Sequence, residues 1–139
     1  MTVARNARAV LVASLAVGYW LAIFTATHLP GHSLPHVGGH DKLHHAAAFA
    51  GLATVLCLAA SVLGRAGART YLAVLLLGAI YGALDELTQS LIPGRTADFW
   101  DWLADVAGLL LGIGLFQIAR RLFGGKDGKN LDPGGVEQD

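Results

Sequence analysis

The chain has 139 residues, of which 54% are hydrophobic and 14% are charged, and its ten basic side chains balance ten acidic ones. So apolar a composition excludes an ordinary soluble globular protein and indicates a membrane protein with one domain. The basic residues are scattered and form no patch with interleaved aromatic residues, so no nucleic-acid partner is expected.

Four apolar segments predict four membrane-spanning helices, at residues 9–27, 46–63, 71–84 and 106–119. The first carries no charge around its circumference, which argues against a soluble four-helix bundle. At 19 residues it is also longer than the apolar part of a cleaved signal peptide. The third and fourth segments have only 14 uncharged residues each, about 21 Å of helix, whereas a hydrocarbon core is about 30 Å thick.

The distribution of Lys and Arg predicts the orientation of these spans. Eight of the ten basic residues fall on the side of the termini, and only Lys42 and Arg95 fall on the other side. Because cytoplasmic loops retain Lys and Arg, both termini are expected in the cytoplasm of a bacterium. The sequence therefore predicts an all-α, multi-pass protein of the cytoplasmic membrane. Residues 1–123 would form the four-helix domain and residues 124–139 a disordered cytoplasmic tail.

The third and fourth helices are expected to continue through an acidic stretch, YGALDELTQSLIPGRTADFWDWLADVAGLLLG. Its acids are Asp85, Glu86, Asp98, Asp101 and Asp105, and its one basic residue is Arg95. All but Asp98 come at similar depths, roughly 22–28 Å from the cytoplasmic boundary. Because a carboxylate facing lipid there costs roughly 2.5–3.5 kcal/mol, these acids are expected to line a cleft inside the bundle, open to the outer face.

Helical spacing places the acids of the fourth helix on one face. Asp98, Asp101 and Asp105 follow one another at steps of three and four, and Gly108 and Gly112 continue the same stripe. The two glycines form a small-xxx-small pair, which is expected to let another helix approach closely. They would position the site without belonging to it.

Three motifs, DKLHHAAAF, DELTQSLIPGR and DWLADVAGLLLG, resemble the VanZ-like family of small membrane proteins. The resemblance covers residues 41–112, and its pattern falls on Asp41, Lys42, His45, Glu86, Gln89, Pro93, Gly94, Arg95, Asp101 and Gly108. Asp105 stands where the family more often has Asn. The family is named for a protein associated with low-level teicoplanin resistance, so the resemblance implies a cell-envelope protein that handles a lipid-linked or glycopeptide-type ligand.

Four residues are candidate catalytic groups: His45, Glu86, Asp101 and Asp105. Crowded carboxylates near lipid can hold a proton on one member while another stays ionised, which suits acid–base chemistry. The same groups could instead hold a divalent cation, or form a hydrogen-bonded structural cluster. No metal or cofactor is assigned, and the sequence leaves open whether the protein is an enzyme.

Lys42 and Arg95 are candidate ligand-binding residues, because they can donate to a phosphate or carboxylate at the outer leaflet. Gln89 is added to them by the family resemblance. A turn at Pro93 and Gly94 would aim Arg95 back toward the bundle, and an ion pair with the acids is its structural alternative. We expect Arg95 and the carboxylates around one cavity, with Lys42 and His45 at its rim.

Other motifs add little. His28, His32, His36, His40 and His44 recur at every fourth position, but Pro and Gly interrupt them, so no metal-binding helix is expected. Cys57 is the only cysteine, which excludes an internal disulfide. The alternatives to a ligand-handling protein are a membrane scaffold whose charged cluster is structural and a small transporter, although no internal repeat is visible.

Overall fold

The computed structural model describes residues 2–29 and 41–124, so nearly all of the predicted tail lies outside the described residues. The described part contains four α-helices and no strand: α1 (Thr2–Thr27), α2 (Asp41–Val62), α3 (Ala68–Gln89) and α4 (Phe99–Phe123). All four are long and apolar enough to cross a membrane. The predicted all-α bundle of four potential spans is therefore confirmed.

The third and fourth helices extend beyond their apolar runs, as the acidic stretch predicted. α3 has 22 residues and α4 has 25, or about 33 and 37 Å of helix, which is enough for a hydrocarbon core of about 30 Å. α4 begins after Asp98, whose side chain accepts a hydrogen bond from the backbone N–H of Trp100 at 2.8 Å. This contact is a standard helix cap, and it explains why the helix starts here.

The predicted turn between α3 and α4 is present at Pro93 and Gly94. Gly94 has a φ of 80°, a value that glycine adopts without strain, and the N–H of Arg95 donates to the carbonyl of Ile92 at 3.0 Å. Positive φ at the third residue and Pro at the second define a type II turn. The turn fixes the direction in which Arg95 leaves the loop.

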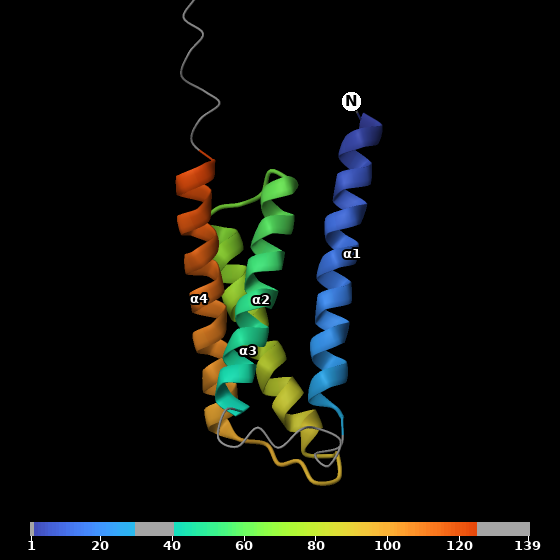
Figure 1. The fold of residues 1–139 in the computed structure, drawn as a ribbon, viewed down its shortest axis with the longest axis vertical. Coiled ribbons are helices and arrows are strands. Elements are labelled where there is room, and N and C mark those ends of the chain that lie inside the picture. The colour runs from blue at the N-terminus through green and yellow to red at the C-terminus, as the bar shows by residue number, and fades with distance from the viewer. Residues whose placement is uncertain (1, 30–40, 125–139) are drawn as a thin grey trace, which may run out of the picture.

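The helices alternate in direction, so the first residues of α1 and the last residues of α4 lie at the same end of the bundle (Figure 1). The opposite end, at the bottom of Figure 1, holds the end of α1, the start of α2, the end of α3 and the start of α4. We call it the loop end. The predicted cytoplasmic location of the termini stays a prediction.

α2 packs mainly against α4, and glycine makes the close approach possible. A Cβ at Gly108 would overlap the backbone carbonyl of Ala46, and one at Gly112 would overlap that of Ala50. The prediction that this pair of glycines admits a neighbouring helix is confirmed. The two glycines therefore let the half of α4 that carries the acids pack directly against α2.

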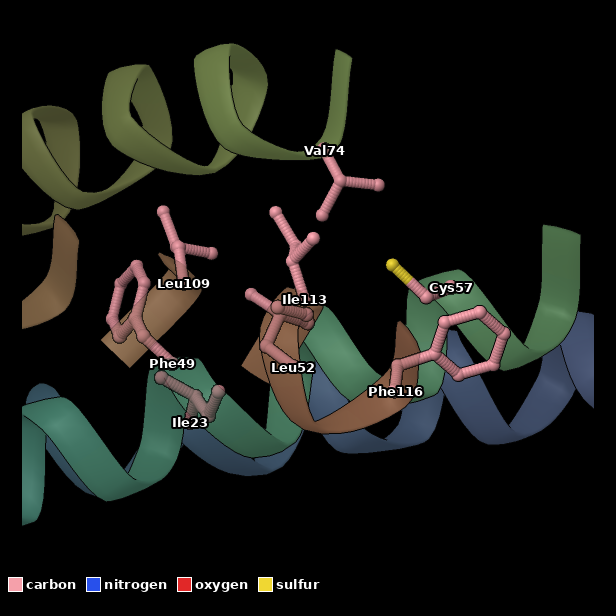
Figure 2. Packing of buried hydrophobic residues seen from close by; sticks show 9 residues of the cluster. Ile23, Phe49, Leu52, Cys57, Val74, Leu109, Ile113 and Phe116 are labelled. Carbon is pink, nitrogen blue, oxygen red and sulfur yellow. The ribbon is translucent and has the colours of Figure 1, made fainter. Parts of the chain in front are cut away.

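The apolar core lies between α2, α3 and α4, with a small contribution from α1 (Figure 2). Phe49 of α2 and Leu109 of α4 are fully buried, whereas α1 supplies Ile23 alone to the buried cluster. Only 6% of the residues in the apolar stretch of α1 are buried, compared with 33% of those in the apolar stretches of α2 and of α4. α1 is therefore a peripheral helix, which fits a sequence that is apolar on every side.

Candidate functional site

The buried polar side chains gather at the loop end of the bundle. Among the described residues, six polar or charged side chains are buried: His45, Asp85, Glu86, Gln89, Asp101 and Asp105. They come from the start of α2, the end of α3 and the start of α4. Five of them are residues that the sequence singled out, and the helices bring those five together.

His45 lies at the centre of this cluster. Its Nδ1 is 3.0 Å from Oδ1 of Asp105, a hydrogen bond from α2 to α4, and 3.7 Å from Oε1 of Glu86 on α3. Its exposed fraction is 6%, so the prediction that His45 lies at the rim is wrong. The close packing of α2 on Gly108 explains the difference, because it carries the neighbouring His45 in among the acids.

Lys42 lies at the edge of the cluster, as predicted. Its Nζ is 2.9 Å from Oδ1 of Asp101 and 3.3 Å from Oδ2 of Asp98, while its side chain remains 53% exposed. The backbone N–H of Asp98 donates to Oε2 of Glu86 at 2.9 Å, which ties the start of α4 to α3. Outside the spans, the N–H of Trp100 and the nearby Lys42 ammonium lower the pKa of Asp98 below its usual value.

Asp85 is a second centre of hydrogen bonds. The sequence placed it among the acids expected to line the cleft, but not among the candidate catalytic or ligand-binding residues. It accepts hydrogen bonds from Gln89 at 2.8 Å, from the Tyr81 hydroxyl at 3.2 Å and from Thr27 of α1 at 3.2 Å. Gln89 also donates to Glu86 at 3.4 Å, so it joins the two acids. Tyr81, Asp85 and Gln89 are spaced four residues apart, which places them on one face of α3. This spacing is the sequence signal that could have identified the group around Asp85.

α1 also reaches the site through His28, just past its last turn. The ring Nε2 of His28 is 3.0 Å from the Thr88 hydroxyl, and its Nδ1 is 3.8 Å from Oδ1 of Asp85. The sequence assigned no role to this histidine. His32, His36 and His40 lie outside the described residues.

Arg95 points toward α1 and not toward the acids. Its Nε donates to the carbonyl of Leu29 at 3.4 Å, and among the described residues it forms no ion pair with a carboxylate. It lines a cavity of about 160 Å³. The lining residues are Ile23, Ala26, Thr27, Asp41, His44, His45, Ala48, Phe49 and Arg95.

The expected arrangement around one cavity is therefore only partly right. The Arg95 cavity, as we call it, shares His45 with the acidic cluster, but Glu86, Asp101 and Asp105 are not among its lining residues. The physical reason is the direction set by the turn at Gly94, which sends the guanidinium to the α1 side of α2. The acids lie on the α3 and α4 side.

Two groups of side chains have the spacing to hold a metal ion. In one, ligand atoms of His45, Glu86 and Asp105 all lie within 4.8 Å of one another, and all three residues are buried. In the other, the ligand atoms belong to Asp41, His45 and Asp101. Lys42 already contacts Asp101 at 2.9 Å, so an ammonium group occupies part of that second group.

Four long apolar helices with a histidine and acids buried at one end define a polytopic membrane protein with an internal polar site. The chain belongs to the VanZ/LLP1 family, whose family model matches residues 8–120. This match confirms the resemblance found in residues 41–112 and extends it to most of α1. Comparison with curated proteins and with solved structures gave no match.

Proposed function

We propose that this VanZ-family protein acts in the bacterial cell envelope by binding a lipid-linked ligand, with the anionic headgroup in the Arg95 cavity and the acyl chain along α1. The observation that carries the proposal is a pair of hollows that follow one another along α1 and α2, one apolar and one polar. Together they fit an amphipathic molecule.

The apolar hollow is a groove of about 440 Å³ between α1, α2 and α3. On α1 it is lined by Ala16, Val17 and Trp20, and the Arg95 cavity begins one turn further on, at Ile23. The two hollows together run from Ala16 to Thr27, about 16 Å at ~1.5 Å per residue.

The headgroup, not the chain, would provide selectivity. An acyl chain in this groove exchanges lipid neighbours for apolar side chains of similar character, so it distinguishes poorly between one lipid and another and mainly keeps the ligand in the membrane. Arg95 is half-buried, and its guanidinium presents a planar set of donors that suits a phosphate or carboxylate. The Lys/Arg bias supports an outer-face location for this end.

His45 connects the Arg95 cavity to the buried acids. It lines the cavity and bonds through Nδ1 to the carboxylate of Asp105. A histidine oriented by a carboxylate beside a binding site is the arrangement of a general base. The site can therefore support proton transfer to or from a bound ligand, with Asp105 and Glu86 as the proton-accepting groups behind it.

A structural role of the cluster is the second candidate function. Lys42 bonds from α2 to Asp101 of α4, and Thr27 bonds from α1 to Asp85 of α3. Such contacts across helices hold a bundle together in lipid, where the hydrophobic effect does not. A scaffold of this kind would need no ligand at Arg95. Only the ligand-binding function therefore predicts that replacing Arg95 weakens the binding of a ligand.

Dodecyl phosphate tests the proposal, because it joins a single alkyl chain to an anionic group. We expect it to bind the purified protein in phosphatidylcholine nanodiscs, and Arg95→Ala to weaken binding about 10- to 100-fold, since a charge-assisted hydrogen bond contributes about 1.5–3 kcal/mol. Arg121→Ala, an exposed arginine at the other end, is the matched control.

Three further binding measurements separate the contribution of the headgroup from that of the alkyl chain. Arg95→Lys should bind less tightly than the wild type, because it keeps the charge and loses the fork. Dodecanol and inorganic phosphate should each bind more weakly than dodecyl phosphate. Equal binding of dodecyl phosphate by wild type and Arg95→Ala would refute the headgroup site, and equal binding of inorganic phosphate would refute the acyl-chain groove.

A further inference from the structure

The buried group formed by His45, Glu86 and Asp105 has the geometry of a coordination sphere. The imidazole Nδ1 lies 3.0 Å from Oδ1 of Asp105 and 3.7 Å from Oε1 of Glu86. Ligand atoms about 2.1 Å from a tetrahedrally coordinated ion lie about 3.4 Å from one another. The two distances lie on either side of this value, and the three ligands come from α2, α3 and α4.

A second observation concerns the other oxygen of the Asp105 carboxylate. Asp105 is fully buried, and within the described part of the chain its Oδ2 has no hydrogen-bond partner. This oxygen belongs to the carboxylate that contacts His45, and it faces α3 at Gly82, one turn before Glu86. A buried carboxylate oxygen without a partner is unfavourable, so a cation, a proton or a water belongs beside it.

The charge balance also calls for a cation. The four buried acids are Asp85, Glu86, Asp101 and Asp105. Among the described residues, Lys42 is the only side chain with a permanent positive charge that contacts any of them, and it contacts Asp101. Arg95 points away. With a neutral His45 the ionised cluster carries three uncompensated negative charges in an apolar bundle, and a divalent cation would reduce these to one.

We infer that His45, Glu86 and Asp105 bind a divalent transition-metal ion such as Zn²⁺ or Mn²⁺. One imidazole nitrogen with two carboxylates is a ligand set typical of these ions, whereas Ca²⁺ and Mg²⁺ prefer oxygen alone. Groups around Glu86 would hold its carboxylate in place: the backbone N–H of Asp98 donates to Oε2, and Gln89 donates to Oε1. The inference does not depend on the proposed lipid-linked ligand. The ion would take the place of the proton between His45 and Asp105, so metal binding is an alternative to proton transfer by these residues.

The test measures metal bound to the full chain, purified without an affinity tag, treated with chelator, reloaded with ZnCl₂ or MnCl₂ and desalted. Elemental analysis should find one ion per chain in the wild type. Glu86→Gln should bind at least 10-fold more weakly, because an amide is a poorer ligand than a carboxylate. Asp98→Asn is the matched control and should retain the ion, since it changes a neighbouring carboxylate that is not a ligand and keeps the helix cap.

A spectroscopic measurement on the wild type avoids dependence on any variant's folding. Cobalt(II) in the site should give the intense visible absorption of a low-coordinate mixed nitrogen and oxygen environment. A wild-type protein without stoichiometric metal would overturn the inference. So would a folded Glu86→Gln protein that binds the ion as tightly as the wild type, because the metal would then be held by other histidines such as His28 or His44.

Discussion

Gly108→Ala should loosen the bundle and disturb the site at once. An added Cβ would overlap the carbonyl oxygen of Ala46 and would lie 2.9 Å from its carbonyl carbon and 3.0 Å from its Cα. These are backbone atoms of a helix, so no side chain can rotate away, and α2 has to move as a unit. The displacement would also stretch the 3.0 Å hydrogen bond between His45 and Asp105, which lies next to this contact.

Overpacking of this kind costs about 1–3 kcal/mol, which corresponds to a loss of roughly 2–12 °C in melting temperature for a domain of this size. Gly114→Ala is the matched control on the same helix. A Cβ there meets nothing within 4 Å, so the better helix propensity of Ala should leave stability unchanged or raise it by up to about 1 kcal/mol.

The assay is thermal unfolding of both variants and the wild type in the same detergent, followed by helical circular dichroism. Gly108→Ala should lower the melting temperature, whereas Gly114→Ala should leave it unchanged or raise it. The comparison therefore separates the effect of helix packing from that of helix propensity. A Gly108→Ala protein as stable as Gly114→Ala would refute the reasoning, because it would mean that α2 and α4 do not approach closely at this point.

Three other predictions concern topology, pH and the α3 network. In a Cys57→Ala background, Leu91→Cys should react with an impermeant thiol reagent from outside the cell and Gly67→Cys should not; the reverse pattern would contradict the orientation. The pKa of Asp98 is lowered in the folded state, so its contribution to stability is present above the unfolded value of about 3.9 and is lost as the pH falls toward the folded pKa. Asp98→Asn should therefore lose less melting temperature than the wild type between pH 6 and pH 3, and equal losses would contradict this. Asp85→Ala leaves three donors without their acceptor, so it should destabilise the protein more than Thr27→Val, which removes only one of these three donors to Asp85; equal melting temperatures would argue against the network.

The sequence predicted those features that depend on one helix at a time. Hydropathy gave the number of spans, and the cost of placing acids in lipid required α3 and α4 to continue through Glu86 and Asp101. The steps of three and four put Asp105 and Gly108 on one face, and both are buried. Pro-Gly chemistry gave the turn before Arg95.

The sequence did not predict features that depend on which helices are neighbours. His45 was expected at the rim because it lies near the start of α2. Its position along that helix does not show how closely α4 approaches. Arg95 was expected among the acids because the turn at Pro93 and Gly94 would aim it back toward the bundle, yet its side chain lies toward Leu29. α1 is apolar on every side, so no periodicity could show that Thr27 faces Asp85.

The peripheral position of α1 determines how freely its sequence can vary. Tyr19 donates to the carbonyl of Ala48, Ile23 enters the core and Thr27 reaches Asp85, while Trp20 packs against Tyr81. One face of α1 therefore contacts the rest of the bundle. Positions such as Val10, Leu11 and Leu15 expose large side chains, and in a membrane these would touch only lipid. Lipid accepts any side chain of similar hydrophobicity, so the lipid-facing side of α1 should tolerate exchange among Leu, Val, Ile and Phe, whereas the face that contacts the bundle should not.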